Sequence, residues 1–226
     1  MRFLRIISTV IHYCHFRGIK RLLDHLEILW IKQHFGYLGN SVYLGKPNYC
    51  LYPQKIYLYD NCSINPGSTF ILFPDPQKEN GRFIMKDGSF AAQNLTIINH
   101  NHTSSPRIGI PFKQQTSNHI GDIIKDVIIE EGVWVGANVT LLAGVVVGRG
   151  SIIGTNSVLR KSVPPYSIVT GNPAKIIGFV FTPEEAIQHE KMLYSEDIRY
   201  SYEELQRNYD KHFLKRIKEI KEFTKI

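Results

Sequence analysis

The sequence contains no run of about 20 apolar residues, which is the length of hydrophobic chain that a membrane-spanning helix needs. Residues 1–7 are basic and apolar, but no long hydrophobic stretch and no small-residue cleavage site follow them, which argues against a secretory signal. Cysteine is also scarce: Cys14, Cys50 and Cys62 are odd in number and lack metal-ligand spacing. We therefore expect reduced thiols, no bound metal and a cytoplasmic location.

Acidic residues are outnumbered, with 20 Asp and Glu against 27 Lys and Arg, a net charge of +7. This excess favours an anionic ligand or surface. The basic residues are dispersed and no base-reading motif accompanies them, so we expect no nucleic-acid partner. The Gly-x-Gly triplets lack the strand-to-helix context of a nucleotide-binding loop.

A period of six residues is the strongest pattern in the chain. Gly or Asn, the residues that most readily adopt a left-handed backbone, stands three positions after each of the first five aliphatic residues of the repeat. A period of six fits neither an amphipathic helix nor a simple alternating strand. It fits short strands that turn a corner and repeat, with small residues at the inner corner. The aliphatic positions are Ile129, Val135, Leu141, Val147, Ile153 and Leu159.

We therefore predict a mainly β protein with a left-handed parallel β-helix over residues of about 37–178. The repeat is imperfect before residue 73, and two segments rich in turn residues, at about 73–82 and 103–122, are predicted to leave the coil as loops. Long loops on a regular scaffold are usually functional.

The two ends of the chain are predicted to be helical. In the N-terminal segment 1–36, one helical face carries Leu22, Leu23, Leu26, Leu29 and Trp30. This face is expected to dock on the core or on a neighbouring subunit, and the alternative is a peripheral contact with a membrane.

In the C-terminal extension 179–226, Thr182-Pro-Glu-Glu and Ser201-Tyr-Glu-Glu are capping boxes that predict short helices. These helices are expected to cap the open end of the coil.

His100 and His102 open the second loop and lie two residues apart, hence on the same side of an extended chain. Three readings are open: exposed histidines at a loop edge, metal ligands, or a general base. A metal site needs a third ligand that nothing nearby supplies. Imidazole titrates near neutrality and can take a proton from a hydroxyl group.

From Asn94 to Ile177 the chain resembles the hexapeptide-repeat acyltransferases, and most closely the galactoside, maltose and other sugar O-acetyltransferases. The family's landmarks occur in order: Gly-Val-Trp-Val-Gly at 132–136, Gly-Arg-Gly-Ser at 148–151, Pro164-Pro165 and Gly171-Asn-Pro-Ala. In that family the catalytic histidine follows an asparagine by eight residues. Eight residues beyond Asn94 stands His102, with His100 as the secondary candidate.

The resemblance implies acetyl transfer from acetyl-CoA with His102 as general base. The backbone N–H of Ala137 would stabilise the oxyanion, and Trp134 and Asn101 would lie on the substrate side. Asn101, His100 or a backbone carbonyl could orient the imidazole. The CoA groove of the family lies between adjacent subunits, so we expect a homotrimer. The positions that match CoA-binding residues are Ala137, Thr155, Arg160, Lys161 and Lys175.

The acceptor is less defined, because the 1–36 segment and the 103–122 loop depart from the sugar acetyltransferase pattern. The leading hypothesis is O-acetylation of a sugar hydroxyl, as in modification of a surface polysaccharide such as O-antigen or capsule. One alternative is acetylation of an antibiotic or of an amino-sugar nitrogen. The other is a β-helix that serves as a non-catalytic scaffold.

Overall fold

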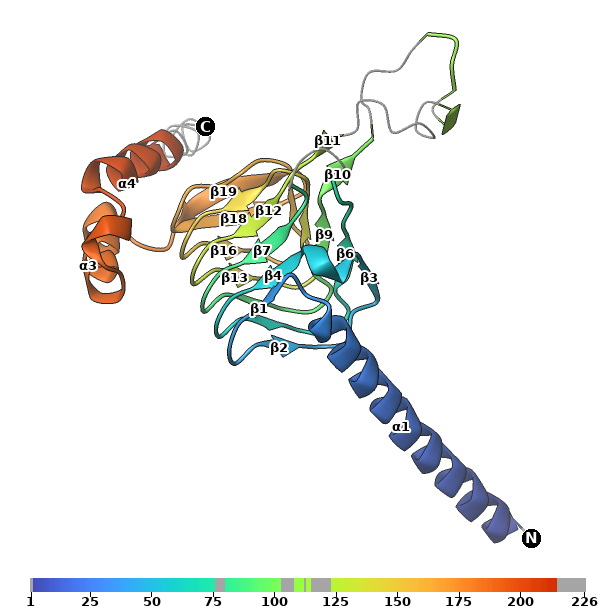
Figure 1. Cartoon of the computed structure of the whole chain (residues 1–226). Helices are drawn as coiled ribbons and strands as arrows, with labels where there is room; N and C mark the ends of the chain where they lie inside the picture. Colours follow the sequence, from blue (N-terminus) through green and yellow to red (C-terminus); the bar gives the residue numbers. More distant parts are fainter. Residues whose placement is uncertain (1, 76–79, 103–107, 112, 115–122, 215–226) are drawn as a thin grey trace, which may run out of the picture.

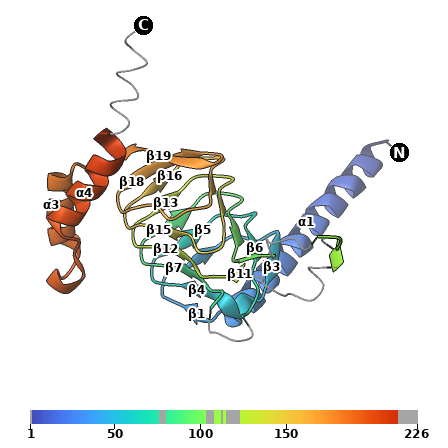
Figure 2. The same cartoon turned by 90° about the horizontal axis from the view of Figure 1, so that it is seen from above.

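The chain winds through the three faces of a triangular prism, one short strand per face, as a left-handed parallel β-helix (Figure 1). The computed structural model describes residues 2–75, 80–102, 108–111, 113–114 and 123–214. The long helix α1 (Arg2–Gln33) leaves the prism on one side, and the C-terminal helices lie on the opposite side (Figures 1 and 2).

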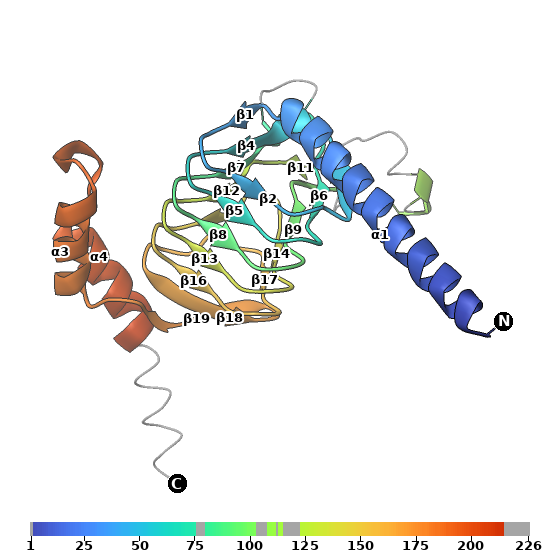
Figure 3. The same ribbon diagram turned by 90° about the horizontal axis from the view of Figure 1, so that it is seen from below.

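Each face is one sheet, and Figure 3 shows the strands stacked along the prism axis. Face A consists of β1 (Tyr37–Leu38), β4 (Ile56–Leu58), β7 (Phe83–Met85), β12 (Val127–Ile129) and β15 (Val146–Val147). Face B consists of β2 (Tyr43–Leu44), β5 (Ser63–Ile64), β8 (Phe90–Ala91), β13 (Trp134–Val135), β16 (Ile152–Ile153), β18 (Ser167–Gly171) and the antiparallel β19 (Ala174–Phe179). Face C consists of β3 (Tyr49–Leu51), β6 (Thr69–Ile71), β9 (Thr96–Ile98), β14 (Thr140–Leu141) and β17 (Val158–Leu159).

The aliphatic residues of the six-residue repeat form the core, as predicted. Parallel pairing stacks Ile129 on Val147 and Leu141 on Leu159, and every one of the six repeat positions is at most 1% exposed. Because each side chain lies above its equivalent in the previous coil, the three faces contribute three stacked columns that meet in one hydrophobic core. The aliphatic residues that recur every six positions in the sequence are therefore stacked at equivalent positions of successive coils.

The predicted corners also hold. The five corner residues Gly132, Asn138, Gly144, Gly150 and Asn156 all have positive φ, between 57° and 81°. Three further positions with positive φ are occupied by Ser41, Tyr52 and Tyr166, residue types that do not mark a corner in the sequence.

Helix α1 is anchored to the prism at its C-terminal end. Ile31 is 4% exposed and Ile28 packs beside it against the core of the prism. Lys46 of the prism forms ion pairs with Asp24 at 2.5 Å and with Glu27 at 2.9 Å, which adds a polar contact to the apolar one. The predicted docking face, from Leu22 to Trp30, does not make this contact; its residues are exposed.

The second predicted loop begins where the coil opens after β9. There β10 (His100–Asn101) and β11 (Ile123–Ile124) pair antiparallel and form a two-stranded neck. Most of the 103–122 loop, including Arg107 and Gln115, lies outside the described residues.

The C-terminal extension contains the predicted helices. Thr182 closes a full capping box at the start of α3 (Pro183–Leu193), and Ser201 accepts from Glu204 N at the start of α4 (Tyr202–Tyr209). Two short helical segments follow α3 and α4: η2 (Glu196–Ile198) and the π-helical η3 (Asp210–Leu214). A further short helix, η1 (Pro53–Lys55), lies in an early coil of the prism.

Arg149 ties this C-terminal unit to the corner between faces A and B. Its guanidinium donates to Glu190 at 2.9 Å and to Glu131 at 3.0 Å, and it stacks 3.9 Å from the ring centre of Tyr194. Burial opposes ionisation of Glu131, but hydrogen bonds from its own backbone and from Arg149 outweigh it and lower the pKa of this carboxyl. The unit is therefore fixed in place on the last coils.

Candidate active site

The predicted site residues fall on two different corners of the prism. The chain passes from face C to face A at the C–A corner, and from face B to face C at the B–C corner. His100, Asn101 and His102 follow face-C strand β9, and Arg160 and Lys161 follow face-C strand β17. Ala137 follows face-B strand β13 and Thr155 follows face-B strand β16. The structure thus brings together the members of each group but not the two groups.

At the C–A corner, His100 is held between two rings. Its ring centre lies 4.1 Å from that of Phe73 and 5.3 Å from that of His102, which it meets edge to face. His100 is half-buried, whereas His102 and Asn101 are exposed. His102 therefore has the access to solvent that a base acting on an incoming hydroxyl needs, and His100 packs against its ring.

Asn99, buried directly before the histidines, holds this corner together. Its amide nitrogen donates to the carbonyl oxygens of Phe73 (2.8 Å) and Gly81 (2.6 Å), and its amide oxygen accepts from the N–H of Phe73 (2.8 Å). The sequence pattern did not single out this residue. An asparagine two positions after Ile97, where the chain leaves the coil, is the signal that would have found it.

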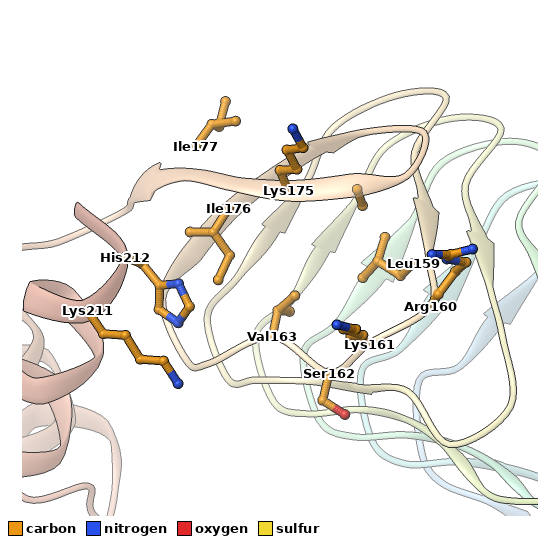
Figure 4. Close-up of a pocket in the computed structure, with 11 residues that line it drawn as sticks. Leu159, Arg160, Lys161, Ser162, Val163, Lys175, Ile176, Ile177, Lys211 and His212 are labelled. Carbon is orange, nitrogen blue, oxygen red and sulfur yellow. The ribbon is translucent and has the colours of Figure 1, made fainter. Parts of the chain in front are cut away.

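Basic residues gather round a cavity of about 750 Å³ farther along the C–A corner (Figure 4). Arg160, Lys161 and Lys175, three of the predicted cofactor-binding residues, line it together with apolar parts of Leu159 and Ile176. Lys175 comes from β19 and the other two from the end of β17, so the fold brings basic residues from separate segments to one cavity. Such a cavity suits a ligand with several negative charges.

Two further basic side chains of this cavity were not found from the sequence. Lys211 and His212 of η3 line it as well, and Figure 4 shows them reaching from the C-terminal unit toward the segment that carries Lys161. The ring of His212 lies 6.5 Å from that of Phe179, which links η3 to β19. They belong to the site only through tertiary packing of the C-terminal unit.

At the B–C corner the candidate functional groups belong to the backbone and carry no charge. Gly136 donates to the Ile153 carbonyl oxygen at 2.8 Å, and the carbonyl oxygen of Ala137 accepts from Asn156 N at 2.9 Å. A Cβ added to Gly136 would lie 2.7 Å from the nitrogen of Thr155, too close for any side chain. The peptide groups around Ala137 are therefore fixed, with the exposed Thr155 in the next coil beside them.

Trp134 lies on the outer surface of face B, near this corner. It is 47% exposed and stacks on Phe90, with ring centres 5.8 Å apart and planes 19° apart. Two stacked, exposed rings next to a fixed backbone corner suit contact with a ligand or with a second subunit.

Metal and thiol chemistry find no support in the part of the chain that the structure describes. No group of three or more His, Cys, Asp or Glu in those residues has the arrangement of a metal site. Burial raises the pKa of the Cys50 and Cys62 thiols to about 11, which makes both poor nucleophiles at neutral pH.

The distance along the C–A corner follows from the stacking. Strand β9 pairs with β14, and β14 pairs with β17, so the histidines and Arg160 leave the same corner two strands apart. At a spacing of about 4.8 Å per strand this separates them by roughly 10 Å along the prism axis. An extended anionic ligand can therefore bind the cavity with one end and reach His102 with the other.

Comparison with known protein families agrees with the observed fold. Residues 126–161 match the family model of the bacterial transferase hexapeptide (six repeats). A probable macrolide acetyltransferase of Lysinibacillus sphaericus is 45% identical over 156 residues, which are 69% of this chain and 69% of the relative. A putative lipopolysaccharide biosynthesis O-acetyl transferase, WbbJ, of Escherichia coli (strain K12) is 37% identical over 94 residues, 38% of this chain but only 44% of the relative.

Among solved structures, a galactoside acetyltransferase in complex with coenzyme A has a similar fold. Its TM-score is 0.55 at 22% sequence identity, over 76% of this chain and 75% of that one. At this level of identity the likeness concerns the fold.

Proposed function

The chain belongs to the hexapeptide-repeat acetyltransferases, and from that premise we propose that it transfers an acetyl group from acetyl-CoA to a hydroxyl group with His102 as the general base. The observation that carries the proposal is the C–A corner, where an exposed histidine and a cavity lined by basic residues lie about two strands apart. The phosphates of CoA suit the cavity, and its thioester then reaches toward His102.

His102 takes the proton of the acceptor hydroxyl while the hydroxyl oxygen attacks the thioester carbonyl carbon. The carbonyl oxygen becomes an oxyanion that accepts a hydrogen bond from the backbone N–H of Ala137. When the oxyanion collapses, the carbon–sulfur bond breaks, and the proton held by His102 passes to the departing CoA thiolate. An acetyl ester and free CoA result.

This mechanism requires a second copy of the chain. Ala137 and Thr155 lie at the B–C corner and His102 at the C–A corner, and face C separates the two corners within one prism. In a cyclic homotrimer whose copies turn face C toward the axis, the C–A corner of each copy meets the B–C corner of the next. Each groove then contains a histidine, a cationic cavity and an oxyanion donor.

The acceptor that we favour is a sugar hydroxyl of a surface polysaccharide. The Escherichia coli relative is named for lipopolysaccharide O-acetylation, and the galactoside acetyltransferase has the same fold. The exposed rings of Phe90 and Trp134 give a flat apolar surface, which suits the face of a sugar ring.

The second candidate is an antibiotic acetyltransferase that acts on a macrolide-like hydroxyl. One observation favours it: the macrolide acetyltransferase relative shares 45% identity over 156 residues, a far longer match than the polysaccharide relative gives. The transfer chemistry is the same for both candidates. They differ in the acceptor that the groove between subunits binds, a polysaccharide sugar or a macrolide.

The test is transfer by the purified full-length chain, followed through release of free CoA thiol and the mass of the product. Oligosaccharides with free hydroxyls, a macrolide and an amino sugar are offered in parallel. We expect transfer to an oligosaccharide and a product that mild alkali cleaves, because an acetyl ester is labile and an amide is not. Transfer only to the macrolide would establish the second candidate. Transfer only to the amine would contradict O-acetylation.

The place of this reaction is proposed as the cytoplasm, where acetyl-CoA is made. Among the described residues, no helix is long and apolar enough to cross a membrane. Cys50 and Cys62 are free thiols in the part of the chain that the structure describes, which supports a reducing compartment.

A further inference from the structure

Where the structure describes the side chains of helix α1, over residues 18–33, the helix has two apolar sides, and one of them contacts the prism. Ile28 and Ile31 dock on the core, while the opposite side is exposed to solvent. At about 100° per residue, the exposed residues fall in one stripe that points away from the docked side. We call this set the α1 stripe. It consists of Ile19, Leu22, Leu23, Leu26, Leu29 and Trp30, each between 43% and 59% exposed.

The charge of the helix is as uneven as its hydrophobicity. Residues 1–23 contain five Arg or Lys residues and no Asp or Glu. The first two acidic residues, Asp24 and Glu27, are both engaged by Lys46 of the prism. Residues 1–23 therefore carry a net positive charge. Lys20 and Arg21 are exposed, and at about 100° per residue they fall on the two flanks of the helix, between the α1 stripe and the docked side.

A second copy of α1 is a poor occupant for this stripe, because pairing would bring together helices that each carry at least five positive charges. An anionic lipid surface meets both features at once. Apolar side chains enter the boundary of the acyl chains, Lys and Arg contact the headgroups, and a tryptophan suits the interface. Figures 1 and 3 show α1 projecting from the prism, so that it can lie on a surface without displacing a strand.

We propose that α1 binds the enzyme peripherally to an anionic membrane through the α1 stripe and the basic residues on the flanks of the helix, Lys20 and Arg21. This binding is independent of acetyl transfer. It keeps the groove between subunits close to a lipid surface, while no part of the chain described here has to cross that surface.

The test is flotation of the full-length protein with phosphatidylcholine vesicles, with and without phosphatidylglycerol. We expect binding only when phosphatidylglycerol is present, and release when the salt concentration is raised. Leu22→Ser together with Leu26→Ser should weaken binding by about tenfold or more, because two apolar side chains that would enter the membrane are lost. Lys20→Glu together with Arg21→Glu should weaken it on the order of 100-fold at low salt.

The matched control is Met192→Ser together with Leu193→Ser on α3, where both residues are exposed, at 82% and 59%. This double variant should bind vesicles as the unaltered chain does. All variants should keep the melting temperature and the acetyl transfer to a soluble acceptor, which separates this proposal from the proposed function. Equal binding to neutral and anionic vesicles, or full binding by the stripe variant, would overturn the proposal. A lower solution mass of the stripe variant would also overturn it, because the stripe would then be a contact between copies.

Discussion

The C–A and B–C corners are built from the same six-residue repeat, yet the B–C corner presents ordered backbone groups and the C–A corner presents basic side chains. At the B–C corner the backbone is continuous: Asn94 N donates to Pro66 O, Asn138 N to Gln93 O, and Asn156 N to Ala137 O. The asparagine side chains add to this ladder, since Asn94 donates to Asn138 at 2.8 Å. At the C–A corner the chain opens into a long loop and gathers histidines, arginine and lysines.

This difference suggests a division of labour between the corners. The proposed general base and phosphate-binding cavity need side chains that titrate or carry charge, and the C–A corner carries side chains of this kind. An oxyanion donor needs an N–H group that does not move during the reaction, and a laddered corner supplies that. In the proposed trimer the two kinds of group meet where one copy faces the next, so the proposed chemistry depends on assembly.

Removal of the base should have the largest effect. His102→Ala is expected to lower kcat by on the order of 10² to 10⁴ while acetyl-CoA still binds, because proton removal is lost and the cationic cavity is intact. Steady-state kinetics and calorimetric titration with acetyl-CoA measure the two quantities separately. His100→Ala is the matched control and should cost far less, since it removes support but not the base. The reverse order would mean that His100 is the base.

A change to the fixed backbone of the B–C corner should have the next largest effect. Gly136→Ala places a Cβ against backbone atoms 2.7 Å away at Thr155 and 2.9 Å away at Ile153, so the peptide beside Ala137 has to shift. We expect kcat to fall roughly 10- to 100-fold, as misplacement of a catalytic group commonly costs that much.

The control for this variant lies four residues earlier. Gly132→Ala meets no atom within 4 Å but forces an L side chain to φ of 65°. It should lower the free energy of unfolding by about 1–2 kcal/mol and leave kcat unchanged below the melting transition. If the two glycine variants lose turnover equally, the geometry at Ala137 is not what matters.

The smallest effect is expected at the cationic cavity. Lys161→Ala should raise KM for acetyl-CoA by about three- to tenfold at low salt, and less at high salt, because screened attraction is what is lost. Turnover at saturation should stay the same. Lys191→Ala, an exposed lysine on α3, is the control. An unchanged KM at low ionic strength would remove Lys161 from the site.

Much of this comparison could be read from the sequence, and the physical reason is local. The repeat fixes which residues point inward, and Gly or Asn at positive φ fixes where the chain turns, so the core from Ile129 to Leu159 and its corners were predictable. Successive strands of the coil belong to faces A, B and C in turn, so counting strands along the sequence already places His102 and Ala137 at different corners of the prism. Family resemblance was needed to choose His102 over His100 and to identify Ala137.

What could not be predicted depends on contacts between distant segments. The approach of Lys211 and His212 to the cavity depends on how the C-terminal unit packs, which in turn depends on the ion pairs of Arg149. The leucine stripe of helix α1 was expected to dock on the core, on a neighbouring subunit or on a membrane. Docking on the core is wrong, because the prism contacts the opposite side through Ile31 and Lys46. A helical pattern shows that a face is apolar without showing what covers it.

The central claim, that each site is shared between two copies, is tested most directly by mixing two inactive chains. His102→Ala removes the base, and Ala137→Pro removes the backbone N–H without touching the histidine. The two variants are co-expressed with different affinity tags, and assemblies that contain both are purified. If the sites are shared, about one site in three of each mixed cyclic trimer has both native groups, and activity returns to roughly a third of the native value. If mixed assemblies form and activity stays at the level of the separate variants, the two corners do not share a site and the account is wrong.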